Sequence, residues 1–166
     1  MRLHDTTFEK VSIFTLGHEL QHGFNHAATM QAYATFQKEA MQATKSHHDY
    51  TAAIGNLIAA NRRDEAGAEI AGWNAVVSMV KTTHSNPTLE DVYKAQPARL
   101  SDFIVVSRAS TTAYTLKPNL ILNADFTLSP TPDNLEAMGQ NFFDKIPDDT
   151  RLGALGNSDY ANYYGA

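Results

Sequence analysis

The stretch TLGHELQHGFN, residues 15–25, carries two histidines four positions apart, with a glutamate directly after the first histidine. An α-helix makes one turn in 3.6 residues, so His18 and His22 lie one above the other on the same face of a helix. Two imidazoles arranged in this way can bind a single zinc ion through nitrogen–zinc bonds of about 2.0–2.1 Å. The stretch therefore predicts a helix that carries two zinc ligands.

Glu19 is the candidate for the catalytic base. Its side chain is rotated by about 100° from His18 around the helix axis, so it lies beside the metal ligands and not among them. From there its carboxylate can take a proton from a zinc-bound water, which is the general-base role in metal-assisted hydrolysis. The pattern therefore predicts hydrolysis in addition to zinc binding.

Large apolar side chains surround the two histidines, and we expect them to bury this helix. They are Phe14, Leu16, Leu20 and Phe24.

His26 follows His22 at one further turn, but it lies about 12 Å along the axis from His18 and cannot share the same ion. The longer motif with a third histidine requires glycine at Asn25 and histidine at Ala28, so it does not apply. We interpret His26 as a polar neighbour or as a support for a ligand.

The composition is that of an ordinary globular domain, and we expect residues 1–166 to form one. Hydrophobic residues make up 43% of the chain and charged residues 19%. A net charge of −5, with no basic cluster larger than Arg62-Arg63, argues against nucleic acid as a partner. The chain has no cysteine, so a metal must be held by histidine and carboxylate.

Two observations concern targeting. No stretch approaches the roughly 18–20 apolar residues of a membrane span. Residues 1–5 show no apolar core of a Sec signal peptide. We therefore expect a protein that is cytoplasmic in its producer or exported by a specialised secretion system.

The apolar periodicity divides the rest of the chain into helical and β-rich segments. It predicts a break at residues 45–49 that includes His47 and His48, helices over residues 50–60, 62–82, 88–95 and 132–145, and β-rich segments at residues 103–106, 111–116, 120–122 and 126–128. The tail, residues 147–166, has little periodicity. The fold class expected is α+β, mainly helical in the first 96 residues, with a small antiparallel sheet in the C-terminal half.

A second informative stretch, DEAGAEIAGWN, occupies residues 64–74. Glu65 and Glu69 are four positions apart and share a helix face. The alanines and glycines around them allow a close approach to another helix. We interpret Glu65 as the third zinc ligand and Glu69 as the acceptor for the N–H of a ligating histidine. Two alternatives remain open: Glu69 is itself the ligand, or both glutamates lie on a solvated face near Arg62 and Arg63.

These motifs resemble those of the gluzincin group of zinc metallopeptidases. The pattern is His-Glu-x-x-His followed by Glu-x-x-Ala-Glu, whose first glutamate lies 43 residues after His22. The resemblance covers about residues 8–80. The compact size is similar to that of metallopeptidase domains of bacterial secreted effectors and polymorphic toxins. What the resemblance implies is a zinc cofactor, a protein or peptide substrate and, for a toxin, a cognate immunity protein as partner.

In the gluzincin group the substrate lies along an edge strand that precedes the active-site helix. Only a few residues precede that helix here, so the sheet would come from downstream or from sequence that is not present. No substrate-binding residue is therefore carried over from the group.

The tail adds candidates for the remaining roles. A phenolic hydroxyl that donates to the developing oxyanion would complete a hydrolase site, and Tyr160 is our candidate. Tyr163 and Tyr164 lie nearby, and the alternative is that these rings only pack the tail onto the body. His84 and Arg108 are weaker candidates for substrate contacts.

The function expected from the sequence is that of a zinc peptidase with ligands His18, His22 and Glu65 and with Glu19 as base. The alternatives are a hydrolase of peptidoglycan or of another amide with the same site, and a zinc-dependent interaction module without chemistry.

Overall fold

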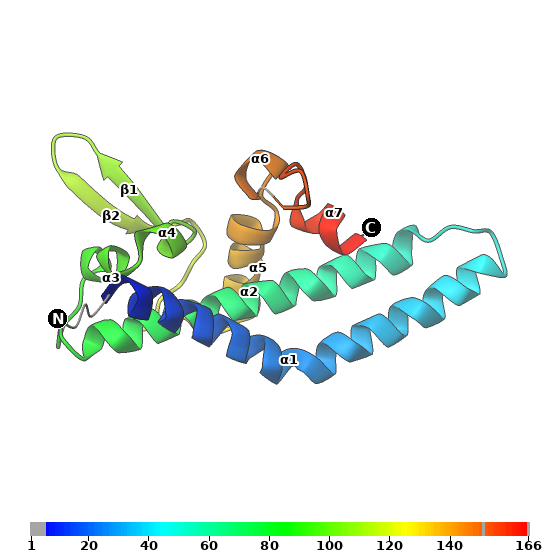
Figure 1. Cartoon of the computed structure of the whole chain (residues 1–166), viewed down its shortest axis with the longest axis horizontal. Coiled ribbons are helices and arrows are strands. Elements are labelled where there is room, and N and C mark those ends of the chain that lie inside the picture. Colours follow the sequence, from blue (N-terminus) through cyan, green and yellow to red (C-terminus); the bar gives the residue numbers. More distant parts are fainter. Residues whose placement is uncertain (1–5, 151, 166) are drawn as a thin grey trace, which may run out of the picture.

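Two long antiparallel helices form a hairpin on which the rest of the protein is built. The computed structural model describes residues 6–150 and 152–165. Helix α1 spans Thr6–Thr44 and helix α2 spans Thr51–Lys81. In Figure 1 this hairpin forms the lower layer, and the elements that follow α2 lie above it. None of the described helices combines the length and the apolar character needed to cross a membrane.

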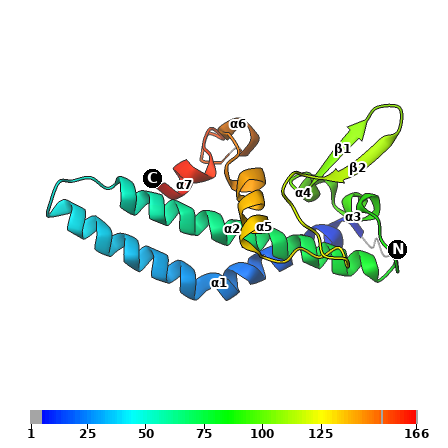
Figure 2. The ribbon, with the colours of Figure 1, turned by 180° about the vertical axis from the view of Figure 1, so that it is seen from behind.

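The elements after α2 are short. They are α3 (Leu89–Ala95), α4 (Pro97–Leu100), β1 (Ile104–Arg108), β2 (Thr112–Leu116), α5 (Pro132–Met138), the π-helix η1 (Gly139–Phe143), α6 (Pro147–Thr150) and α7 (Tyr160–Gly165). The two strands pair antiparallel, with Ile104 opposite Leu116. Seen from behind, α5 crosses α2 near its middle (Figure 2). The expected fold class, mainly helical α+β with a small antiparallel sheet, is confirmed.

Small residues bring α1 and α2 into close contact. A Cβ atom at Gly17 would lie 2.9 Å from the carbonyl oxygen of Ala71, and one at Gly72 would lie 2.7 Å from the ring of Phe14. Both distances are shorter than side-chain atoms tolerate, so only glycine fits at either position. This close approach places the histidine-bearing face of α1 against the glutamate-bearing face of α2.

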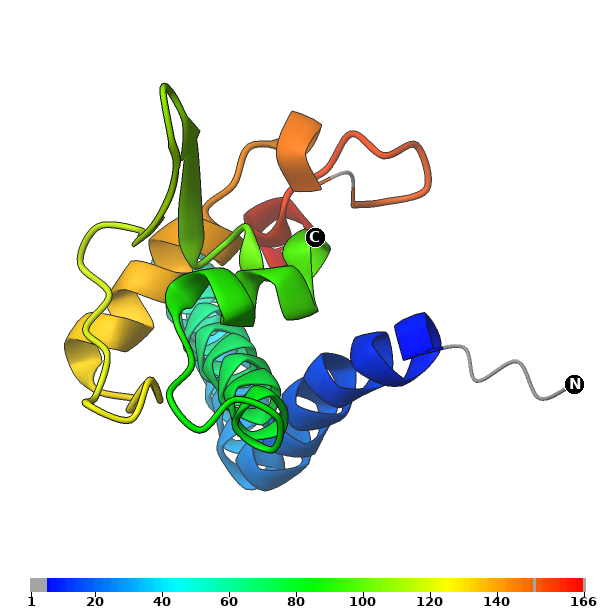
Figure 3. The ribbon, with the colours of Figure 1, turned by 90° about the vertical axis from the view of Figure 1, so that its left-hand side faces the viewer.

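The apolar core lies toward the C-terminal end of α2, between this helix and the segments packed on it. Trp73, Phe14, Phe103 and Leu100 are completely buried there. The indole N–H of Trp73 donates to the carbonyl of Phe126 over 2.8 Å. Viewed along the hairpin in Figure 3, α1 and the segments after α2 lie mostly on different sides of α2. Helix α2 is therefore the central element of the fold.

The expected break between helices over residues 50–60 and 62–82 is wrong, because α2 is continuous through this region. Asn61 is buried, and its side-chain amide donates to the carbonyl of Leu57 one turn earlier, over 2.9 Å. A polar side chain that satisfies its donor within its own helix does not interrupt that helix.

The expected burial of α1 by its large apolar residues is also wrong, except at Phe14. Leu16, Leu20 and Phe24 are 58%, 54% and 80% exposed. Leu16 and Leu20 are each two positions from His18, which places them about 200° around the helix, on the face turned away from α2. Phe24 has the same relation to His22. These three hydrophobic residues are therefore not on the face of α1 that packs against α2.

The β-rich segments at residues 120–122 and 126–128 form only a single bridge, between Leu122 and Leu128. A buried side chain, Asn134 of α5, replaces the missing strand partner. Its carbonyl oxygen accepts the N–H of Ile121, and its amide donates to the carbonyls of Ile121 and Ser129. The extended backbone is thus satisfied without a ladder.

Two further expectations about helices need correction. The helix expected over residues 132–145 changes to the π-helix at Gly139, where a Cβ atom would collide with the guanidinium group of Arg62. The tail, for which little periodicity was expected, contains α6 and α7. Both are too short to show a helical repeat in the sequence.

Candidate metal centre

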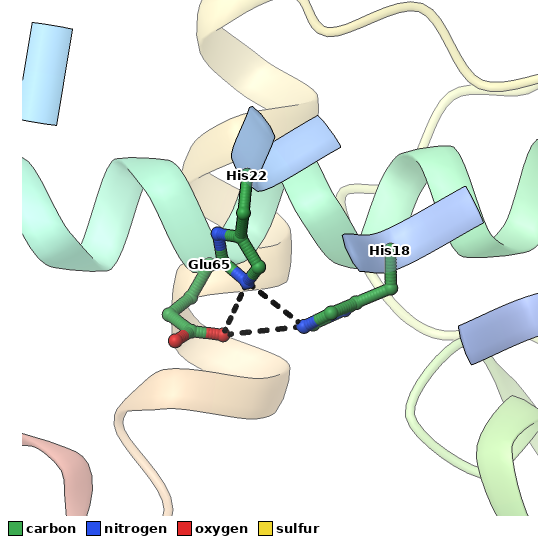
Figure 4. A group of neighbouring side chains, drawn as sticks. All are labelled: His18, His22 and Glu65. Carbon is green, nitrogen blue, oxygen red and sulfur yellow. Dashed lines mark hydrogen bonds and ion pairs between the residues drawn. The ribbon is translucent and has the colours of Figure 1, made fainter. Parts of the chain in front are cut away.

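Three side chains from α1 and α2 point toward one another (Figure 4). The Nε2 atoms of His18 and His22 lie 3.0 Å apart. The Oε2 atom of Glu65 lies 3.8 Å from Nε2 of His18 and 3.9 Å from Nε2 of His22. The structure therefore brings together the three residues that the sequence suggested as metal ligands.

The spacing of these three atoms suits a metal ion. A point equidistant from three atoms at these separations lies about 2.1 Å from each, and this length is that of zinc bonds to histidine nitrogen and carboxylate oxygen. Glu65 is buried, whereas His18 and His22 are partly exposed. Two imidazoles and one carboxylate form a donor set that several divalent transition metals accept.

The ring of His18 is oriented by Glu69. Its Nδ1 lies 3.1 Å from Oε1 of Glu69, a residue that is 1% exposed. Both atoms are buried and neither makes a hydrogen bond in the described chain, so this close ion-pair contact is the partner that each has. A proton on Nδ1 leaves the lone pair of Nε2 directed at the other two candidate ligands. Glu69 thus lies where the sequence suggested a support for a histidine ligand.

The ring of His22 is oriented by Asp64, a residue that was not among the candidates from the sequence. Its Nδ1 lies 2.9 Å from Oδ2 of Asp64. The other oxygen of Asp64 accepts the side-chain amide of Asn25 over 2.7 Å, and Asn25 in turn accepts the amide of Gln21. A signal existed in the antiparallel pairing. Because the two helices are antiparallel, the step from His18 to His22 along α1 corresponds to about one turn backward along α2 from Glu69, which ends at residues 64–65.

The remaining oxygen of Glu65 is held by the C-terminal helix. The hydroxyl of Tyr164 donates to Oε1 of Glu65 over 2.6 Å, across 99 positions of sequence. Both oxygens of this carboxylate thus have defined roles, one toward the histidines and one toward α7. From the sequence, Tyr164 is only a neighbour of Tyr160, because nothing local marks which tyrosine of the tail reaches α2.

Tyr160 lies close to the same group without a hydrogen bond to it in the described residues. Its ring packs on Phe142 and Phe143, with centroids 4.9 and 5.2 Å apart. Burial raises the pKa of Tyr160, and the nearby carboxylates of Glu65 and Glu69 raise it further. The phenol therefore keeps its proton at neutral pH and remains a hydrogen-bond donor.

Glu19 lies next to His18 on α1 and is exposed. Its charge contributes to raising the pKa of His18, so the carboxylate lies close enough to act on that ring. The structure gives it no hydrogen bond among the described residues. Glu19 is therefore a carboxylate near the three candidate ligands that is not one of them.

The pair of His18 and Glu69 retains a proton strongly. Burial lowers the pKa of His18, but contact with Glu69 and the charges of Glu69, Glu65 and Glu19 outweigh it, so the pKa lies above 6.5. Burial raises the pKa of Glu69, and contact with His18 offsets part of that rise. Both shifts favour one proton held between Nδ1 and Oε1.

The other candidates from the sequence lie away from this group. His26, His47 and His48 are exposed. His84 is 4.0 Å from a carboxylate oxygen of Asp91 on α3. Arg108 ends β1, at the tip of a β-hairpin that points away from the helices (Figure 1).

Comparison of the chain with protein-family models, with curated proteins and with solved structures finds no match in any of the three.

Proposed function

We propose that this protein is a zinc-dependent peptidase. One observation carries the proposal: the ligand atoms of His18, His22 and Glu65 surround a point at zinc-bonding distance, and buried or partly buried carboxylates orient both imidazoles. Ligating histidines in catalytic zinc sites are typically held by carboxylates in this way. The resemblance of the two sequence motifs to gluzincins points to the same chemistry.

His18, His22 and Glu65 would hold the zinc ion, which when bound would act as a Lewis acid that polarises a carbonyl group and lowers the pKa of a water. Glu19 takes a proton from the attacking water as the new C–O bond forms. It then delivers that proton to the amine nitrogen as the C–N bond breaks. Because Glu19 is not needed to hold the metal, its carboxylate is free to change protonation state.

Tyr160 is the proposed donor to the oxyanion. Its raised pKa keeps the phenol protonated at neutral pH, and a protonated phenol can stabilise the negative charge that develops on the carbonyl oxygen. The packing of its ring on Phe142 and Phe143 limits its rotation. Such preorganisation is what makes a donor effective in a transition state.

The proposed substrate is a protein or peptide. An effector or toxin role, with export by a specialised system and a cognate immunity protein, rests on the sequence resemblance alone.

The decisive experiment compares the zinc-loaded protein with Glu19→Gln. We expect the variant to keep its zinc and its melting temperature, because Glu19 is not a ligand, and to lose about 10²–10⁴-fold in hydrolysis, the contribution of a general acid–base group. Glu39→Gln provides a matched control on α1. Glu39 accepts a hydrogen bond from Asn56, which a glutamine oxygen can also accept.

Zinc is measured by elemental analysis, and hydrolysis by sequencing the new termini in an unfolded protein mixture, with purified peptidoglycan as a parallel substrate. Cleavage of peptidoglycan alone would move the assignment to an amide hydrolase. Stoichiometric zinc with no hydrolysis of either substrate would favour an interaction module. A chain that takes up no zinc would overturn the metal site.

A further inference from the structure

A cavity of about 410 Å³ lies between the helical hairpin and α7. Its walls include two apolar or aromatic side chains from each of three helices: Tyr33 and Phe36 of α1, Ile54 and Leu57 of α2, and Tyr163 and Tyr164 of α7. Tyr33 and Tyr163 are 38% and 59% exposed, so the cavity is reached from solvent. Its volume is in the range of sites that hold small organic groups.

This cavity lies next to the candidate metal centre, with Tyr164 between the two. The ring of Tyr164 forms part of its wall, while the hydroxyl of the same residue donates to Glu65. A single side chain therefore separates the cavity from the group of ligands.

The distance along the hairpin determines how many residues of an extended substrate would lie between the metal centre and the cavity. Leu57 and Glu65 are eight residues apart on α2, which is about 12 Å along the helix axis. An extended peptide advances by about 3.3 Å per residue. A side chain in the cavity would therefore belong to a residue three or four positions from the peptide bond at the metal centre.

We propose that this cavity is a distal subsite for an aromatic or large aliphatic side chain of a polypeptide substrate. This assignment rests on the proposed peptidase function. The lining residues carry no charge, so a charged side chain would lose its hydration there without gaining a partner. Aromatic walls offer stacked or edge-on contacts to an incoming ring. The subsite thus selects apolar residues at a fixed distance from the cleaved bond.

The first test measures binding without catalysis. The probe is N-acetylphenylalaninamide, with N-acetylalaninamide and N-acetylaspartamide as controls, and the readout is the methyl NMR signals of Ile54 and Leu57. We expect saturable shifts of these signals with the phenylalanine probe only, while the signal of the buried core residue Val77 stays in place. Absence of saturable shifts, or equal shifts with all three probes, would overturn the subsite.

A cavity-filling variant localises the effect. Ile54→Trp places a large ring in the cavity and should abolish the shift of the Leu57 signal. Ala52→Trp adds the same ring at an exposed position of α2 and should leave binding unchanged. If Ile54→Trp melts at the wild-type temperature and still binds the probe, the cavity is not the binding site.

The second test uses cleavage of a peptide library by the zinc-loaded protein. We expect kcat/KM to be about tenfold higher for substrates with a large apolar residue three or four positions from the cleaved bond than for those with alanine there. Ile54→Trp should erase this preference, and Ala52→Trp should keep it.

The outcomes separate the two proposals. Cleavage with no positional preference would overturn the subsite and leave the peptidase in place. Probe binding without cleavage of any peptide would overturn the peptidase and, with it, the assignment of the cavity as a substrate site.

Discussion

Carboxylates determine which nitrogen of each histidine is available for a metal. Glu69 and Asp64 lie against the Nδ1 atoms of His18 and His22, so that both Nε2 atoms face Glu65. The two supports differ in burial, since the side chain of Glu69 is 1% exposed and that of Asp64 is 16% exposed. Water can reach a vacated Asp64 site more easily, and Glu69 is therefore the support whose loss would be harder to compensate.

The pH dependence of metal affinity tests the role of Glu69. A metal and a proton compete for Nε2 of His18, whose pKa lies above 6.5 because its carboxylate neighbours outweigh burial. Metal affinity should therefore be constant above this raised pKa and fall by about tenfold per pH unit below it. In Glu69→Gln the neighbouring charge is lost, so the onset of the fall should move to lower pH.

Zinc titration against a chelator at several pH values provides the measurement. Glu39→Gln, which lies elsewhere on α1, should keep the wild-type profile. An unchanged onset in Glu69→Gln would mean that Glu69 does not control the protonation of His18.

At the level of single residues, local periodicity was enough to pair His18 with His22 and Glu65 with Glu69, because each pair is spaced by one helical turn. It could not identify Tyr164, whose contact with Glu65 depends on where the tail packs. Non-local contacts of this kind leave no trace in local spacing.

At the level of elements, the site depends on how closely α1 approaches α2. Gly17→Ala would place a Cβ atom 2.9 Å from the backbone oxygen of Ala71 and force the helices apart next to His18. We expect the free energy of unfolding to fall by about 1–3 kcal/mol, the usual cost of overpacking, and metal affinity to fall with it.

Gly23→Ala is the matched control on the same helix. Nothing lies within 4 Å of a Cβ atom at residue 23, so alanine should stabilise the helix by about 0.5–1 kcal/mol. Denaturant unfolding and metal titration of both variants check the pair. Equal effects of the two substitutions would show that the contact at Gly17 does not set the separation of the helices.

The elements themselves were predictable where the apolar repeat was long and where a proline followed it. Helix α3 begins after Thr88, which accepts the N–H of Asp91 in a capping box, and its bounds agree with the helix predicted over residues 88–95. The predicted strand at residues 120–122 did not form because a side chain, Asn134, satisfied its backbone. Apolar periodicity predicts which face of a segment is buried. It does not predict when a polar side chain will make the backbone hydrogen bonds that a neighbouring strand would otherwise make.

At the level of the whole molecule, Arg62 of α2 ties the C-terminal half to the hairpin. Its guanidinium group makes paired hydrogen bonds to the carboxylates of Glu136 and Asp144, the shortest of them 2.7 Å. Arg62→Ala should reduce the free energy of unfolding by about 1–2 kcal/mol, because paired charge-assisted bonds exceed single exposed ion pairs. The adjacent, exposed Arg63→Ala should have little effect.

The hydrogen bond with Arg62 lowers the pKa of Glu136 below its ordinary value of 4.5. A depressed carboxyl pKa contributes stability above the unfolded pKa and loses it as pH falls through the folded pKa. The difference in unfolding free energy between wild type and Arg62→Ala should therefore be full at neutral pH and shrink below pH 4.5. Urea unfolding at several pH values measures it; a constant difference would exclude Glu136 as the partner that matters.

Tyr164 connects the C-terminal helix α7 to the candidate metal ligand Glu65 of α2. Tyr164→Phe leaves Oε1 of Glu65 without its 2.6 Å donor. Metal affinity should then fall by about 10–100-fold, as is usual when a group that orients a ligand is lost. Tyr163→Phe removes a hydroxyl from an exposed neighbour in the same helix and should leave the affinity unchanged. Equal zinc affinities of the two variants would show that α7 does not contribute to the metal site.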